Sequence, residues 1–214
     1  YTSAASDNII VGNYIGTDAT GQIAIGNGVS GIAVNGGQRN TIGSTATGGR
    51  NVISANKQDG IVLNQGGGNN KIIGNYIGLN ADGNKRLGNG SYGFETSTAN
   101  NLIQKNVISG NVNSGIVLWL SSANNNKVIG NYIGTDKTGT IDIGNWVNGI
   151  DVSNGSKDNI IGGTSSADRN IISGNDKYGV LVYQGSNNKF YNNYVGTDVT
   201  GTKNLKNMGD GFRL

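Results

Sequence analysis

The stretch GNYIGTDATG at residues 12–21 decides the fold of this chain, because it recurs three more times. It returns as GNYIGLNADG at 74–83, as GNYIGTDKTG at 130–139 and as NNYVGTDVTG at 192–201. Successive copies start 62, 56 and 62 residues apart. A period of this length, kept over the whole chain, is typical of a repeat architecture.

Three columns of Asn divide the chain into seven shorter units. The first column is Asn8, Asn40, Asn70, Asn101, Asn126, Asn159 and Asn188. The second is Asn13, Asn51, Asn75, Asn106, Asn131, Asn170 and Asn193. The third is Asn27, Asn56, Asn89, Asn111, Asn145, Asn175 and Asn207. A marker Gly follows each member of the third column by four residues, at Gly31, Gly60, Gly93, Gly115, Gly149, Gly179 and Gly211.

Short alternations of apolar and polar residues follow these markers. Ile10 stands two residues after the first-column Asn, Ile15 two after the second, and Ile32 and Val34 follow the marker Gly. The other units repeat this pattern, which predicts three short strands per unit. Stacking the units would align like strands in three parallel sheets around an apolar interior. We therefore expect an all-β coil of about seven turns with three parallel sheets, forming one domain over residues 1–214.

The Asn columns have structural explanations in such a coil. Asn and Gly tolerate the left-handed backbone that sharp corners need. Identical Asn side chains stacked one coil apart can also form hydrogen-bonded ladders along the axis. The columns account for 21 of the 35 Asn residues.

The insertions between columns are equally regular. From the second to the third column the gap alternates between 14 and 5 residues, so every odd coil carries a long loop that contains the TDATG phrase. From the first to the second column the gap is 5, except in coils two and six, where it is 11. The six extra residues lie around 44–50 and 163–169, and coil four lacks them.

Coils of this size, with Asn at the tight bend in IIGNYIG and VIGNYIG, resemble right-handed parallel β-helix proteins of the pectin-lyase-like class. The GNYIGTDxTG and RNVIS motifs also resemble repeats of large bacterial cell-surface and secreted proteins. This resemblance implies an extracellular or cell-surface location and a chain that is a segment of something longer. It leaves function open, because one fold hosts many activities.

Composition narrows the possible partners. The net charge of +3 comes from scattered Lys and Arg without a basic run, so we expect no nucleic-acid partner. No apolar run of 18 residues occurs, so we expect no membrane span. Without Cys there is neither a disulfide framework nor a thiolate metal site.

Catalytic signatures of the resembled class do not stand out. The chain has no His, no Pro and no adjacent acidic residues, which removes the hydrolase and epimerase patterns of that class. Its 12 Asp and one Glu are spread along the coils, so no clustered set of calcium-holding carboxylates of the lyase type is visible. We expect no catalytic residues, although an enzyme remains an open alternative.

The strand after the marker Gly presents outward residues that could bind sugars, and in the resembled class this face is the sugar-binding one. Trp119 and Tyr183 should lie two coils apart, about 10 Å at the usual strand spacing. They could stack on alternate sugar rings, while Glu95 or Asp151 accepts hydroxyl hydrogen bonds. The alternative is that Trp119 packs under a neighbouring loop and Tyr183 covers the adjacent coil.

The long loops also raise the possibility of calcium binding. They contain Asp18, Asp136 and Asp198, with Asp82 shifted by two residues. One carboxylate per loop is few for an ion that gathers six to eight oxygens. We favour a turn in which each Asp caps the Thr and Gly backbone that follows it, and no metal site or cofactor.

Three functional hypotheses follow. The first is a non-enzymatic extracellular module, acting as a stalk or as an adhesive segment that binds polysaccharide or another glycan. The second is a polysaccharide-active enzyme of the lyase, hydrolase or epimerase type, working on the same outward face. The third is a filament subunit whose open coil ends pair with flanking repeats or with another copy, because unpaired strand edges invite pairing.

Overall fold

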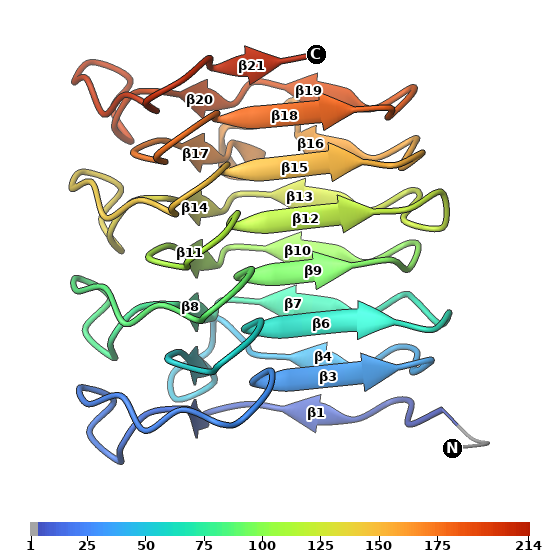
Figure 1. Cartoon of the computed structure of the whole chain (residues 1–214), viewed down its shortest axis with the longest axis vertical. Coiled ribbons are helices and arrows are strands. Elements are labelled where there is room, and N and C mark those ends of the chain that lie inside the picture. Colours follow the sequence, from blue (N-terminus) through green and yellow to red (C-terminus); the bar gives the residue numbers. More distant parts are fainter. Residues whose placement is uncertain (1–3) are drawn as a thin grey trace.

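The computed structural model describes residues 4–214 and winds them into a coil of three parallel sheets (Figure 1). Sheet 1 contains β1 (Ile9–Ile10), β4 (Thr41–Ile42), β7 (Lys71–Ile73), β10 (Leu102–Gln104), β13 (Lys127–Ile129), β16 (Ile160–Gly162) and β19 (Lys189–Tyr191). Sheet 2 contains β2 (Tyr14–Ile15), β5 (Val52–Ile53), β8 (Tyr76–Ile77), β11 (Val107–Ile108), β14 (Tyr132–Ile133), β17 (Ile171–Ile172) and β20 (Tyr194–Val195). Sheet 3 contains β3 (Ile32–Asn35), β6 (Ile61–Asn64), β9 (Phe94–Thr96), β12 (Ile116–Trp119), β15 (Ile150–Ser153), β18 (Val180–Tyr183) and β21 (Phe212–Arg213).

Each coil contributes one strand to each sheet, and the winding is right-handed (Figure 1). This confirms the predicted all-β parallel β-helix of about seven coils. A single turn of 3₁₀ helix, η1 (Ser166–Asp168), interrupts the strands and lies in the insertion of coil six.

Apolar side chains from all three sheets fill the interior of the coil. Ile53, Ile77, Ile108 and Ile133 stack in register on sheet 2, and each is 0% exposed. The equivalent side chains of sheets 1 and 3 belong to the same buried cluster. The period-two pattern therefore identified the core side chains correctly.

The three Asn columns form continuous ladders, as predicted. In each column every side-chain amide donates to the Oδ1 of the next Asn, at 2.8–3.1 Å. Most central members also donate to a backbone carbonyl; Asn131, for example, bonds the Ile103 carbonyl at 2.9 Å. The buried side-chain amides of the ladders thus have hydrogen-bond partners within the protein and need no water.

The ladder Asn residues do not themselves adopt the left-handed backbone, so that part of the corner prediction was wrong. Before every first-column Asn stands a residue with a φ of 54–61°: Asp7, Arg39, Asn69, Asn100, Asn125, Asp158 and Asn187. At the second column the φ of Gly130 is 64°, whereas Asn131 has no positive φ. The corner residue supplies the bend, which leaves the Asn that follows free to form the ladder.

The long loops of the odd coils form an ordered ridge outside sheet 2. Three backbone bonds join successive loops, from Ala81 N to Gly21 O, from Lys137 N to Gly83 O and from Val199 N to Gly139 O, at 2.8–2.9 Å. Within a loop, Asp136 accepts the Thr138 hydroxyl at 2.7 Å. Its other oxygen accepts the backbone N–H groups of residues 140 and 141, each at 3.0 Å, rather than those of the Thr and Gly that follow directly.

Asn80, and not Asp82, occupies the equivalent position in the loop of coil three. Its Oδ1 accepts the backbone N–H groups of Asn84 and Lys85, each at 3.1 Å. Asp82, shifted by two residues as the sequence indicated, instead accepts the Gln22 side-chain amide at 3.1 Å. A neutral amide closes this loop as well as a carboxylate closes the others.

Candidate functional site

The outer face of sheet 3 brings the four predicted site residues into two neighbouring columns. Glu95 pairs with Val117, which pairs with Asp151. One column further along, Trp119 pairs with Ser153, which pairs with Tyr183. Each predicted pair is thus separated by one strand, about 10 Å between its members.

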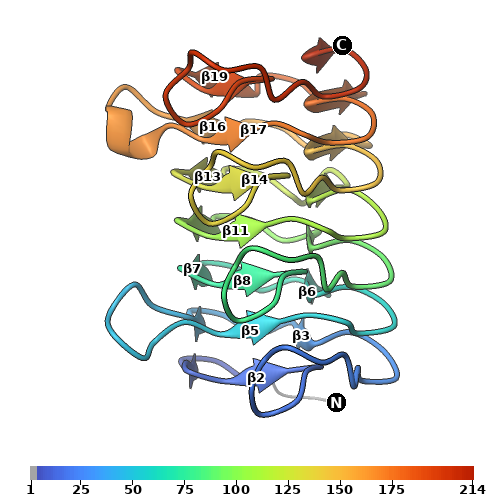
Figure 2. The same cartoon turned by 90° about the vertical axis from the view of Figure 1, so that its left-hand side faces the viewer.

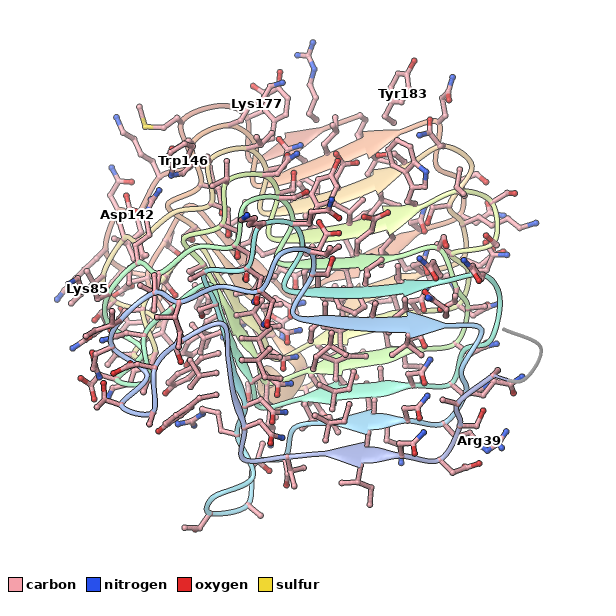
Figure 3. All side chains as sticks on the ribbon, turned by 60° about the horizontal axis from the view of Figure 1, so that its bottom comes forward. Arg39, Lys85, Asp142, Trp146, Lys177 and Tyr183 are labelled. Atoms are coloured by element: carbon pink, nitrogen blue, oxygen red, sulfur yellow. The ribbon has the colours of Figure 1, made fainter. Side chains whose placement is uncertain are left out.

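Trp119 and Tyr183 are exposed, at 37% and 56% of their surface. They stand at the ends of β12 and β18, where the strands leave the sheet. Figure 3 shows Tyr183 pointing away from the ribbon at this end of sheet 3, with Trp146 on the side of the long loops. The two rings are accessible to a ligand along one line of the surface.

Asp151 is half-buried on β15 and is held by two neighbours. The Ser153 hydroxyl donates to its Oδ1, and the Asn148 side-chain amide donates to Oδ2 at 3.4 Å. Burial raises the pKa of Asp151 to about 6, and the opposing effects of Asn148 and Lys177 do not cancel it. Asp151 therefore carries a proton at mildly acidic pH and can donate as well as accept a hydrogen bond.

Glu95 is half-buried on β9, and burial raises its pKa, with a further contribution from the charge of Asp59. Tyr92 lies near this carboxylate. Its own pKa is raised first by burial and then by the charges of Glu95, Asp151 and Asp59. A phenol hydroxyl and carboxyl groups thus share the face, which suits hydrogen bonding to sugar hydroxyls.

Sequence reasoning missed Tyr92 and Asn148, although a signal for them exists. The residue just before each marker Gly is aligned from coil to coil. In successive coils its carbonyl accepts the N–H of the preceding coil's marker Gly, as Tyr92 O does from Gly60 N and Asn148 O from Gly115 N, each at 2.9 Å. This position forms another column along the edge of the sheet, and it contributes polar groups beside Glu95 and Asp151.

Metal ligands do not gather on this face. Within residues 4–214 no group of three or more acidic side chains is placed to hold a metal ion. The carboxylates of Asp18, Asp136 and Asp198 accept hydrogen bonds from their own loops. The absence of a metal site in these loops stays a prediction from the sequence. No helix in the described part of the chain is long and apolar enough to cross a membrane.

Comparison with known proteins agrees with this architecture. The family model described as right handed beta helix region matches residues 5–195, and the chain belongs to that family. No curated protein and no solved structure matched the chain.

Proposed function

We propose that this chain is a non-enzymatic, extracellular β-helix module of a bacterial surface or secreted protein that binds polysaccharide on the outer face of sheet 3. The observation that carries the proposal is the exposure of Trp119 and Tyr183 in one column, beside the half-buried Glu95 and Asp151. Aromatic rings flanked by carboxyl groups suit the apolar faces and hydroxyl edges of sugars. Detection of the native protein only inside the cell would contradict the location.

The coil itself supports a role as a rigid stalk. Three ladders and three sheets run through seven coils, and each strand pairs with the equivalent strand of the next coil. Each coil therefore contacts its neighbours along the whole contour of the coil, and bending the axis would break several bonds at once. A rigid support is useful to a module that presents a binding face at a distance from a surface.

Binding is tested by titrating a panel of neutral and acidic polysaccharides with the wild type and the Trp119→Ala variant. We expect Trp119→Ala to weaken binding of the best ligand by about tenfold, as for loss of one stacking ring. The matched control is Trp146→Ala, which removes a ring that is 52% exposed but lies away from sheet 3. Equal losses in both variants, or no binding by the wild type, would contradict the proposal.

The rival function is an enzyme acting on polysaccharide, and the specific observation in its favour is the raised pKa of both Glu95 and Asp151. Reducing-end release and the absorbance of unsaturated products separate the two functions. We expect no turnover. Turnover that Glu95→Gln or Asp151→Asn abolishes would replace the binding proposal with the enzymatic one.

End-to-end association is a further candidate, favoured by apolar groups on the outermost coils. Ile10 and Phe212 are in register with the fully buried Ile42 and Val180, yet Ile10 is only half-buried and Phe212 is 43% exposed. The outermost strands of each sheet have one neighbour within residues 4–214. These surfaces suit further coils or a second copy. Light scattering of the 214-residue chain should show an average molecular mass that increases with protein concentration. A constant monomer mass would exclude this association.

A further inference from the structure

A second surface feature lies on the outer face of sheet 2 and arises from the insertion that coil four lacks. The inserted loops at 44–50 and 163–169 project at the levels of β5 and β17, and nothing projects from this edge between them (Figure 2). The short corner of coil four leaves a groove of about 420 Å³, bounded on its other side by the long loops. Coils two and six are four strands apart, about 19 Å at the usual spacing.

Four cationic side chains line this groove, which we call the basic groove: Arg50, Lys105, Lys137 and Arg169. The other lining residues are neutral, and no carboxylate is among them. Only two ion pairs form within residues 4–214, Asp7–Arg39 and Asp210–Arg213, and neither involves a groove cation. A protein with a net charge of +3 thus concentrates unpaired positive charge in one hollow.

The two arginines are held in place by neighbouring aromatic rings. The Arg50 guanidinium lies 4.0 Å from the centre of the Tyr76 ring, and its Nε donates to the Gly74 carbonyl at 3.3 Å. Arg169 lies 4.0 Å from the centre of the Tyr194 ring. Within residues 4–214 the two Nη atoms of Arg50 have no hydrogen-bond partner. The guanidinium, held in a fixed position, can therefore donate two parallel N–H hydrogen bonds to an anion.

Lys105 occupies a strained backbone position in the middle of the groove. Its φ is 55°, and in coils three and five the equivalent residues are Gly74 and Gly130, with φ values of 70° and 64°. The left-handed region is less favourable for a residue with a side chain than for Gly. A side chain at this position, in place of the Gly of coils three and five, puts a cation at the middle of the groove.

The shape of the groove favours a sugar chain over a nucleic acid. Single-stranded nucleic acids bind by stacking their bases on open aromatic faces. Tyr76 is only 5% exposed, because Arg50 covers its ring and Gly83 of the long loop packs so closely that an added Cβ would lie 2.6 Å from it. Beside half-buried Tyr132, the cations and polar groups of the groove suit carboxylate or sulfate groups on a sugar chain.

We propose that the basic groove is a binding site for an acidic polysaccharide, whose carboxylate or sulfate groups contact Lys105, Lys137 and the exposed edge of Arg50. Arg50, Lys105 and Arg169 all stand just before a second-column Asn, in coils two, four and six. Their backbones therefore recur about every 9.6 Å along the axis. An anionic chain lying along the axis would meet one cation every second coil. This site is separate from sheet 3 and does not depend on sugar binding there.

The test measures binding of labelled oligogalacturonate and of a sulfated heparin oligosaccharide by fluorescence anisotropy. A neutral malto-oligosaccharide and a thymidine oligonucleotide of similar length serve as comparison ligands. We expect either acidic glycan to bind, with an affinity that falls as salt rises. The variant Lys105→Glu/Lys137→Glu should lose at least about tenfold in affinity.

The matched control is Lys71→Glu/Lys127→Glu, which makes the same change in net charge at two exposed lysines on sheet 1. It should bind as the wild type does. Lys105→Gln/Lys137→Gln provides a milder variant, whose folding is checked by its unfolding transition and whose affinity should fall several-fold. Equal losses in the groove and control variants, tighter binding of the oligonucleotide, or no binding of either acidic glycan would overturn the proposal.

Discussion

Inside the coil each turn presents the same residue type at the same position, whereas outside it neighbouring turns differ. Sheet 2 buries Ile53, Ile77 and Ile108 one above the other. The outer column of sheet 3 instead carries Glu95, then Val117, then Asp151. An interior side chain is constrained by the coils on both sides of it, whereas the outer column ranges from buried Val117 to half-buried Glu95 and Asp151. Residues that repeat from coil to coil therefore indicate the fold, and positions at which the repeat is broken indicate where function lies.

The sharpest test of this difference compares two isoleucines. Ile77 is 0% exposed, and Ile77→Ala should lower the free energy of unfolding by about 2–5 kcal/mol, because it leaves a cavity between two coils. Ile141, on a long loop, is 56% exposed, and Ile141→Ala should change stability by less than about 0.5 kcal/mol. Urea unfolding of both variants gives the comparison, and similar costs would refute the coiled interior.

A second test concerns the ladders. Asn131→Ala removes the amide that bonds Asn170 at 3.0 Å and Ile103 at 2.9 Å, and the oxygen that accepts both nitrogens of Asn106 at 3.0 Å. We expect a loss of about 1–3 kcal/mol from buried groups left unpaired. Asn13→Ala, at the exposed start of the same ladder, should cost clearly less in the same urea titration. A loss at Asn13 as large as at Asn131 would mean that ladder position does not matter.

The sequence was most informative where all coils agree. The Asn columns and the Ile positions predicted the three sheets, the register and the ladders, because a repeated residue in a coil has a repeated neighbour. The same register predicted that Trp119 and Tyr183 share one column of the outer face. Their contacts could not be predicted, since these depend on side chains from several coils that share no pattern.

The basic groove was missed for a physical reason. Its signal was present, as a missing insertion in coil four and as a basic residue before the second-column Asn in three even coils. Reading that signal as a site requires knowing that the flanking insertions project from the same edge. It also requires knowing that Lys137 reaches the groove from a long loop. Both facts belong to loop geometry, which the repeat does not encode.

The long loops differ from the rest of the outer surface, because they lie outside the coil and yet are closely packed. Gly139 has a φ of 70°, and an added Cβ would lie 2.9 Å from the Val199 Cβ and 3.2 Å from the Tyr132 ring. Gly139→Ala should therefore cost about 1–2 kcal/mol for the left-handed backbone alone. Gly28→Ala, with nothing within 4 Å of the added Cβ, should be nearly neutral in thermal unfolding. A neutral Gly139→Ala would show that the ridge is loosely packed.

The smallest expected effect is a pH dependence from the outer face. The pKa of Asp151 is raised by burial to about 6 in the folded protein, above its ordinary value of 3.8, so the folded state holds a proton that the unfolded state releases. Stability contributed by this group should therefore fall as pH rises from about 4 to 6, and should change little above that range. Asp151→Asn should reduce this slope, leaving the part that Glu95 contributes through its own raised pKa, and should leave the protein slightly more stable than the wild type at neutral pH.

Asp18 provides the contrast, because the Thr20 hydroxyl and backbone N–H groups of its loop lower its pKa to about 2. Its contribution has the opposite sign: it is present above pH 4 and is lost as pH falls toward 2. Asp18→Asn should therefore leave the slope between pH 4 and 6 intact. Unfolding measured at several pH values in that interval compares the two variants. If Asp151→Asn kept the wild-type slope, the pKa of Asp151 would not be raised in the folded protein, and its use as a proton donor to a sugar would lose its basis.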